Sequence, residues 1–270
     1  MTTQTSRGLA VVTGASAGIG AVYADRLAKR GYDLLLVARN EERLHALADR
    51  LANETGRRIE PFKADLGRKE DLSRLEARLR EDASITLLVN NAGIGSVASI
   101  LTGEVEEMDA MIQLNITALT RLTYAAAPSF VARGSGTIIN ISSVVGIAAE
   151  ALNGVYSASK SYVLSFGHSL QKDLADKGVR IQTVLPGATA TEFWDVAGYA
   201  AQKTSSTTMS AADLVDAALI GLDQGERVTI PGLQDLGDWT RWEEGRRAIS
   251  AQFGNAKPSS RYGLATANAA

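Results

Sequence analysis

Residues 9–20 read LAVVTGASAGIG, an apolar run followed by three closely spaced glycines. The run over residues 9–13 predicts a buried strand, and helix formers then extend over 21–30 as far as Gly31, a residue type that commonly ends a helix. The glycines between the two elements predict a tight turn. This stretch therefore predicts a strand, a turn and a helix, which is the repeating unit of parallel α/β folds.

The same alternation continues along the chain. Strands that alternate with helices indicate a parallel sheet covered on both faces. We therefore expect a doubly wound, Rossmann-like parallel sheet in a three-layer α/β/α arrangement, with ligands at the carboxyl ends of its strands. Further strands are predicted at residues 34–38, 59–62, 87–89, 137–141, 179–185 and 228–230, with later helices at 155–174, 211–222 and 235–250.

The composition indicates one globular domain. Its 270 residues, 45% of them hydrophobic, can bury one large core, so we expect a single domain over 1–270. The formal net charge is −2 and basic residues are mixed with acidic ones, a pattern that disfavours nucleic acid and anionic lipid as partners. Cysteine is absent, which excludes thiol catalysis and disulfides. No stretch has the pattern of a signal peptide or a membrane span, so we expect a cytoplasmic protein.

Two late segments differ from the rest in composition. Small and hydroxyl residues over about 188–210 predict a substrate-binding loop, in which the run 204–208 is either a plain surface loop or a substrate lid. Residues 251–270 have the composition of a poorly ordered tail.

Two chemical patterns overlap at the glycine turn. Gly14 to Gly18 reads G-x-S-x-G, the nucleophile elbow of serine hydrolases, with Ser16 as the nucleophile. That chemistry needs a downstream histidine in a loop, whereas His45 and His168 both lie within predicted helices. The alternative is a turn at a helix N-terminus whose glycines let a dinucleotide phosphate approach the backbone. We favour the second interpretation, in which Ser16 faces the phosphate or the adenosine ribose.

The spacing G-x-x-x-G-x-G over residues 14–20 resembles the cofactor motif of the short-chain dehydrogenases/reductases. Further matches, in that family's order and spacing over about residues 9–230, are Asp65-Leu66, Asn90-Asn91-Ala92-Gly93, Asn115, Ser143, Tyr156 with Lys160, and Pro186-Gly187 with Thr191. The resemblance implies an oxidoreductase that transfers a hydride between a nicotinamide and a carbonyl or secondary alcohol, without a metal. A non-enzymatic regulator that binds the same cofactor is the alternative.

The resemblance also implies a set of cofactor-binding residues. Some of them have plainer explanations, because Asp65 could begin the next helix and Asn91 could stabilise the central strands. Pro186 and Gly187 could form an ordinary turn. The full set is Gly14, Ser16, Gly18, Ile19, Gly20, Arg39, Asp65, Leu66, Asn91, Ala92, Gly93, Tyr156, Lys160, Pro186, Gly187, Thr189 and Thr191.

The end of the second predicted strand indicates which nicotinamide cofactor is used. An acid at this place binds the ribose 2′-hydroxyl of NAD, but here Ala38 and Arg39 follow the strand. A guanidinium pairs with a 2′-phosphate, so we expect NADP(H). The alternative is that Arg39 is a solvated residue at a helix start. Ala17 weakens the prediction slightly, since many NADP-dependent relatives carry a second basic group in the glycine turn.

Tyr156 and Lys160 lie four residues apart and therefore share one face of a predicted helix. A free tyrosine has a pKa near 10, and a nearby ammonium, helped by an oxidised nicotinamide, would lower it toward neutrality. By resemblance, Tyr156 is the catalytic acid and base, Lys160 tunes it and binds the nicotinamide ribose, and Ser143 orients the substrate carbonyl. Ser142 is then structural.

Asn115 has two possible roles. By resemblance it kinks a helix and holds a water molecule that joins Lys160 to solvent. The plainer alternative is a satisfied asparagine of the core.

The substrate is expected to be a small-molecule carbonyl compound or alcohol of apolar character. The predicted substrate-binding residues are Ser143, Val145, Tyr156, Phe193 and Trp194, with Ile94 and Ile147 beside family pocket positions. The apolar residues among them could equally be packing residues. The predicted helix 155–174 has a small-residue face, formed by Ala158, Ser161, Ser165 and Ser169. This face is consistent with the homodimer or homotetramer that the resemblance implies.

Overall fold

The computed structural model describes residues 6–263 of the chain. Its contacts divide the chain into two compact units, one that ends at Gly232 and one that begins at Leu233. The sheet and all the predicted site residues belong to the first unit. The prediction of a single domain over residues 1–270 stays a prediction.

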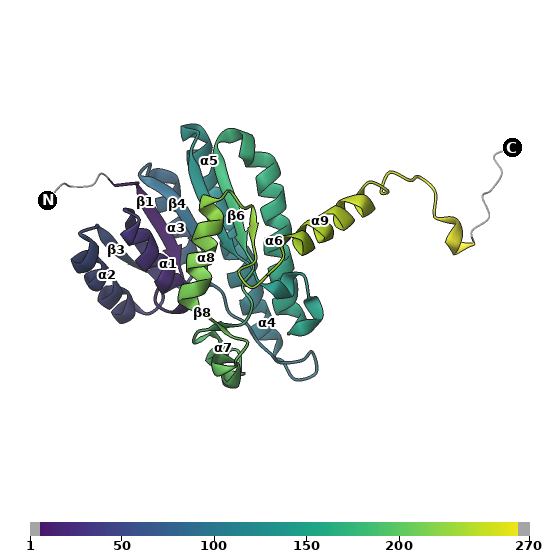
Figure 1. Cartoon of the computed structure of the whole chain (residues 1–270). Helices are drawn as coiled ribbons and strands as arrows, with labels where there is room; N and C mark the ends of the chain where they lie inside the picture. Colours follow the sequence, from purple (N-terminus) through teal and green to yellow (C-terminus); the bar gives the residue numbers. More distant parts are fainter. Residues whose placement is uncertain (1–5, 264–270) are drawn as a thin grey trace. The chain divides into compact units, whose positions relative to one another are not determined.

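The first unit contains a parallel sheet of seven strands, in the order β3-β2-β1-β4-β5-β6-β9 (Figure 1). Every neighbouring pair in this sheet is parallel, and the strand order reverses between β1 and β4. The predicted doubly wound sheet is therefore confirmed. The strands are β1 (Leu9–Thr13), β2 (Asp33–Ala38), β3 (Ile59–Lys63), β4 (Ile85–Asn90), β5 (Gly136–Ile141), β6 (Val179–Val184) and β9 (Val228–Thr229).

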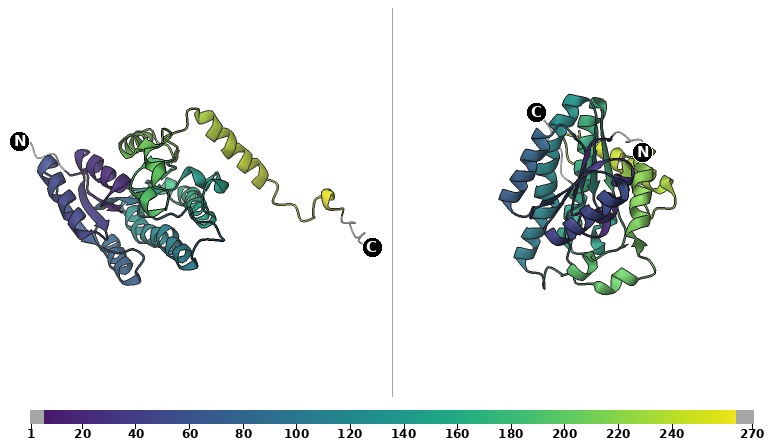
Figure 2. Two further views of the ribbon diagram at one scale, coloured as in Figure 1. Left: turned by 90° about the horizontal axis from the view of Figure 1, so that it is seen from below. Right: turned by 90° about the vertical axis from the view of Figure 1, so that its left-hand side faces the viewer.

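Helices cover both faces of the sheet and complete the three layers. Val12 of β1 packs with α1 (Gly18–Lys29), α2 (Glu41–Thr55) and α8 (Ala211–Asp223) in one core. Its neighbour Val11 packs with three further helices of the first unit in a second core. These are α3 (Lys69–Glu81), α5 (Leu119–Arg133) and α6 (Gly154–Leu174). The right-hand view of Figure 2 shows α3 and α5 on one side of the sheet and α8 on the other. Successive residues of β1 are thus both fully buried, which explains its continuous apolar sequence.

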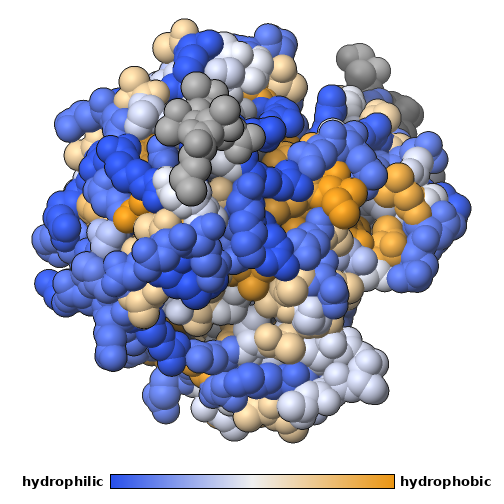
Figure 3. Space-filling view, turned by 60° about the vertical axis from the view of Figure 1, so that its left-hand side comes forward, coloured by the Kyte–Doolittle hydropathy of each residue, from blue (hydrophilic) through white to orange (hydrophobic). Residues whose placement is uncertain are grey.

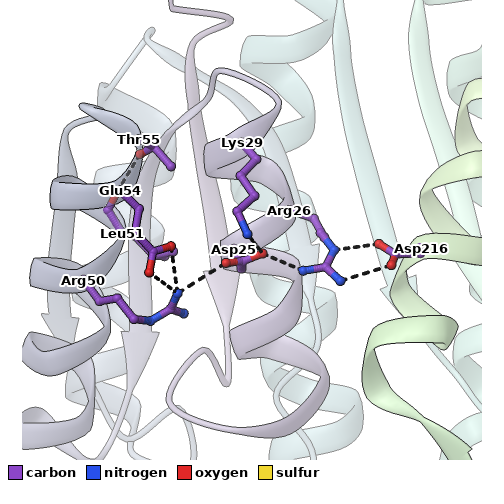
Figure 4. Close-up of polar contacts among 8 residues, drawn as sticks. All are labelled: Asp25, Arg26, Lys29, Arg50, Leu51, Glu54, Thr55 and Asp216. Carbon is purple, nitrogen blue, oxygen red and sulfur yellow. Dashed lines mark hydrogen bonds and ion pairs between the residues drawn. The ribbon is translucent and has the colours of Figure 1, made fainter.

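A buried carboxylate ties three helices together on one of these faces (Figure 4). Asp25 of α1 accepts from Arg26 at 2.6 Å and from Lys29 at 2.9 Å, and it also pairs with Arg50 of α2. Arg26 reaches Asp216 of α8 at 2.7 Å. Burial acts to raise the pKa of Asp25, but the hydrogen bonds from Lys29, Arg26 and Arg50 together lower it. This network stabilises the helices that follow the glycine turn.

The segment predicted as a loop over about 188–210 has structure of its own. It begins with β7 (Thr189–Ala190), which pairs in parallel with β8 (Met209–Ser210). Between them lies α7 (Phe193–Val196). The pairing of these two short strands brings the two ends of the segment together. We call residues 189–210 the substrate-side excursion.

The second unit contains α9 (Leu236–Ser250), which begins at the predicted position with Asp235 as its N-cap. Trp239 stacks on Trp242 within this helix. Beyond Ser250 the described residues form exposed turns and one short 3₁₀ helix, Ser260–Tyr262. The remainder of the predicted tail, residues 264–270, lies outside the described residues.

Hydrophilic residues cover most of the face drawn in Figure 3. Within residues 6–263, no helix is both long enough and apolar enough to cross a membrane.

Candidate active site

A cavity of about 460 Å³ opens at the carboxyl edge of the sheet. Its walls include residues that directly follow the ends of four strands: Gly14 after β1, Asn91 after β4, Ser142 after β5 and Pro186 two residues after β6. A second cavity of about 370 Å³ continues past the end of β2. The two share Gly14, Arg39 and Ala92 among their walls, so they form one cleft around the point where the strand order reverses.

Most of the predicted site residues line this cleft. Ser16, Asp65 and Leu66 line only the second cavity. Gly20, Asn115 and Ile147 line neither. Those that line the first cavity are Gly14, Gly18, Ile19, Arg39, Asn91, Ala92, Gly93, Ile94, Ser142, Ser143, Val145, Tyr156, Lys160, Pro186, Gly187, Thr189, Thr191, Phe193 and Trp194.

The glycine turn needs glycine for two different reasons. Gly14 and Gly18 have φ angles of +66° and +54°, in the left-handed region that other residues avoid. Gly20 instead allows close packing, because a Cβ there would lie 2.2 Å from the Gly14 carbonyl oxygen. Gly20 therefore supports the turn from behind, and the structure does not place it at the cofactor cleft as predicted.

The N-terminus of α1 is open to a phosphate. Its N-cap is Ala17, and no side chain caps the first turn. In contrast, α2 is capped by Asn40 and α6 by Asn153. The free N–H groups and the positive end of the helix dipole thus face the cleft, which fits the diphosphate of a dinucleotide.

Thr13 joins the ends of β1 and β4. Its hydroxyl donates to the Val89 carbonyl at 3.1 Å and accepts from the backbone N–H groups of Asn91 at 2.9 Å and Ala92 at 3.0 Å. The Asn91 side chain donates to the carbonyls of Thr13 at 2.8 Å and Gly14 at 3.3 Å. The plainer explanation for Asn91, stabilisation of the central strands, therefore matches its side-chain contacts. Sequence reasoning missed Thr13 as a supporting residue.

Tyr156 and Ser143 meet inside the cleft. Tyr156 lies in the first turn of α6, and its side chain and that of Ser143 line the same cavity. Ser143 Oγ also lies 3.3 Å from the carbonyl of Pro186, to which it can donate. Burial raises the pKa of Tyr156, and the Ser143 hydroxyl opposes this only in part. The predicted lowering includes the charge of an oxidised nicotinamide and stays a prediction.

Lys160 lies one helical turn further along α6. Its Nζ donates to the Ile141 carbonyl at 3.0 Å and lies 5.6 Å from the centroid of the Tyr156 ring. Burial lowers the pKa of Lys160 to about 8. Ser142, predicted to be structural, donates from its hydroxyl to the Lys160 carbonyl at 2.7 Å.

Asn115 lies in a π-helical turn, Gln113–Ala118, between α4 (Val105–Ile112) and α5. Its amide accepts from the Ile94 N–H at 3.0 Å, donates to the Ile94 carbonyl at 2.9 Å and reaches Ser159 Oγ at 3.1 Å. Both side-chain groups are satisfied, as the plainer alternative expects. A Cβ placed on Gly93 would lie 3.0 Å from Asn115 Oδ1 and 3.6 Å from Lys160 Nζ, so both side chains approach Gly93.

The second cavity has charged and polar residues in its walls beyond the end of β2. Arg39 directly follows β2, is exposed, and makes no ion pair within residues 6–263. Asp65 accepts from the Gly67 N–H at 3.0 Å and forms a turn ahead of α3. Ser16 lines this cavity, and neither His45 nor His168 lines either cavity. The walls around Ser16 therefore include no histidine to act as the base of a serine nucleophile.

Aromatic side chains form part of the cavity wall beside Tyr156. The Phe193 ring lies 5.5 Å from the Tyr156 ring between centroids, and it meets Trp194 edge-on at 5.3 Å. The Trp194 indole donates to the Thr189 carbonyl at 2.9 Å. Sequence reasoning missed Gly95, where a Cβ would lie 2.3 Å from Phe193 Cζ. Its position two residues after the Asn-Asn-Ala-Gly match was the available signal.

An open helix N-terminus, a glycine turn and a buried Tyr–Lys pair define a dinucleotide-dependent oxidoreductase. Comparison with known proteins agrees. A family model described as short chain dehydrogenase matches residues 8–200. A short-chain dehydrogenase from Sphingobium yanoikuyae, solved in complex with NADPH, is 45% identical with a TM-score of 0.92, over 94% of this chain and 100% of that one.

Two further relatives are similar over most of their length. The bulky-bulky ketone specific alcohol dehydrogenase from Comamonas testosteroni is 41% identical with a TM-score of 0.89, over 96% of this chain and 99% of that one. An uncharacterized oxidoreductase of Staphylococcus saprophyticus is 35% identical over 223 residues, 82% of this chain and 94% of that protein. The chain therefore belongs to the short-chain dehydrogenase family, and the predicted family is confirmed.

Proposed function

We propose that the protein is an NADP(H)-dependent carbonyl reductase or alcohol dehydrogenase whose catalytic residues are Ser143, Tyr156 and Lys160, supported by Asn115. The observation that carries the proposal is that buried Ser143, Tyr156 and Lys160 line one cavity together with the glycine turn. The predicted NADP-dependent oxidoreductase activity agrees with the family and with its NADPH-bound relative.

The cleft fits NADP(H) by its own chemistry. The uncapped first turn of α1 would bind the diphosphate, and Arg39 would pair with the 2′-phosphate. No acid stands directly after β2 to repel that phosphate. The bound cofactor supplies or accepts the hydride. The other predicted cofactor-binding residues stay assignments by resemblance.

The side chains supply the acid–base chemistry. In the reducing direction, the Tyr156 hydroxyl gives its proton to the carbonyl oxygen as the carbonyl carbon becomes an alcohol carbon, and Ser143 donates a hydrogen bond to that oxygen. The Lys160 ammonium then stabilises the phenolate that remains. A path past Gly93 and Asn115 would return the proton from solvent.

The substrate that fits best is an apolar ketone or its alcohol. Val145, Phe193 and Trp194 present apolar surface beside Tyr156, and the similar Comamonas enzyme is described as specific for bulky ketones. Exposure of Ala158, Ser165 and Ser169 on α6 supports assembly as a homodimer or homotetramer. We also propose a cytoplasmic location.

The activity is tested with a panel of carbonyl compounds. Consumption of NADPH is measured by the loss of its absorbance. Tyr156→Phe is expected to reduce turnover at least about a thousandfold while NADPH still binds. Tyr162→Phe is the matched control, because Tyr162 lies on the same helix with its hydroxyl 2.9 Å from that of Thr120. Turnover retained in Tyr156→Phe would contradict the mechanism. NADPH binding without turnover across the panel would favour the regulator.

A further inference from the structure

One ion pair ties the substrate-side excursion to the helix beside the second cavity. Arg43, in the first turn of α2, donates from Nη1 to Glu192 Oε2 at 2.7 Å, although 149 residues separate the two in sequence. Glu192 lines both cavities, and Arg43 lines the second one beside Arg39. The pair therefore lies at the cofactor cleft, unlike the ion pairs of Asp25 between helices.

The two neighbours of Glu192 contact other parts of the site. Thr191 Cγ2 lies 3.1 Å from the point where a Cβ on Gly18 would stand, so this segment closely approaches the glycine turn. Phe193 packs against the Tyr156 ring. The Phe193 N–H donates to Thr191 Oγ1 at 3.3 Å, which keeps the three residues in one tight turn. An ion pair at Glu192 therefore restrains residues 191–193, which border both the glycine turn and Tyr156.

The charges at this place also need an explanation. A carboxylate near a site for a 2′-phosphate raises the energy of the bound anion unless a cation compensates it. Arg43 provides that cation for Glu192, which leaves Arg39 available for the phosphate. The two arginines then have separate roles.

We infer that Arg43 and Glu192 form a clasp, an ion pair that closes the cleft over the bound dinucleotide and slows its release. The inference rests on the proposed binding of NADP(H). The clasp holds residues 191–193 in place and does not contact the 2′-phosphate. It therefore slows the release of NADPH and of NADH to the same extent. Both side chains are about half-exposed, at 49% and 53%, so the effect is that of a surface pair, about two- to fivefold in rate.

Stopped-flow fluorescence measures the release rate when bound NADPH is chased with excess NADP⁺, and bound NADH with excess NAD⁺. Glu192→Gln is expected to release both reduced cofactors about two to five times faster than the wild type. The double charge reversal Arg43→Glu with Glu192→Arg is expected to restore slow release, since it rebuilds the pair. Screening by about 1 M salt should bring the wild type close to Glu192→Gln.

Glu41→Gln is the matched control. Glu41 lies in the same turn of α2, pairs with Lys63 at 2.8 Å and is 55% exposed, but it lines neither cavity. It should leave both release rates unchanged, and all variants should unfold thermally close to the wild type.

Several results would overturn the clasp. Unchanged release in Glu192→Gln, or equal acceleration in Glu41→Gln, would show that the pair does not close the cleft. Slower release of NADPH alone in Glu192→Gln would show instead that the carboxylate repels the 2′-phosphate. Wild-type protein that binds neither cofactor would refute the proposed function itself, whereas wild-type binding with unaltered variants refutes only the clasp.

Discussion

The Lys160 ammonium donates a hydrogen bond of 3.0 Å to the backbone carbonyl of Ile141, the last residue of β5. The hydrogen bond fixes the charge beside the Tyr156 ring, while burial lowers the pKa of Lys160 to about 8. Burial removes water from around Lys160, and this loss of hydration costs the most free energy when the lysine is protonated.

This cost predicts how stability depends on pH. In the folded protein Lys160 loses its proton near pH 8, whereas in the unfolded chain it does so near its ordinary value of 10.5. Between these values the unfolded state binds more protons, so the free energy of unfolding rises with pH. From about pH 7 to about pH 9.5, the wild type should gain about 2 kcal/mol relative to Lys160→Met. Urea unfolding at the two pH values measures this, and parallel changes in both proteins would contradict the prediction.

Arg39 is expected to decide the choice between the two nicotinamide cofactors. Arg39→Asp replaces a partner of the 2′-phosphate with a like charge, so the KM for NADPH should rise at least about tenfold. NADH lacks that phosphate, and its KM should change far less. Steady-state kinetics with both cofactors measures the difference. Equal changes in the two KM values would mean that Arg39 is only a solvated residue.

Thr13→Val should destabilise the cleft without changing any residue that touches substrate. Valine has nearly the same shape but leaves the N–H groups of Asn91 and Ala92 without their acceptor. The free energy of unfolding should fall by about 2–4 kcal/mol. Thr13→Ser keeps the hydroxyl and should lose clearly less. Denaturant unfolding of both variants tests this, and equal losses would point to packing instead of hydrogen bonding.

Gly95→Ala should narrow the substrate side of the cleft. The added methyl group would stand 2.3 Å from Phe193 Cζ, so the ring must move. We expect roughly a tenfold higher KM for bulky ketones, with NADPH binding unchanged. Adding Phe193→Leu removes the clashing atom and should recover much of the loss. A KM that stays at the wild-type value in Gly95→Ala would show that Phe193 does not limit the pocket.

Much of the fold was predictable because it depends on local pattern. Continuous apolar runs predict β1 and β2, and Gly31 predicts the end of the helix between them. Strand ends agreed to within about two residues. The excursion that contains β7, α7 and β8 was not predictable, because two-residue strands carry no periodic signal.

The site divides in a similar way. Spacing places Tyr156 and Lys160 on one helix face, but their predicted roles depend on the family resemblance. Arg39 is predicted from its place directly after a strand. Gly20 was assigned to the cofactor site although it packs against the carbonyl of Gly14. Spacing alone does not distinguish a glycine that faces a ligand from one that lets two backbones approach.

The sequence by itself determined the class of fold, the glycine turn and the types of residue available for catalysis, since these follow from periodicity and from spacing along one helix. Only the tertiary structure decided how those residues act. Burial raises the pKa of Tyr156 and lowers that of Lys160, and Arg43 meets Glu192 across 149 residues of chain. Hydration and long-range contact depend on what surrounds a side chain in space, and neither is written in the order of its neighbours.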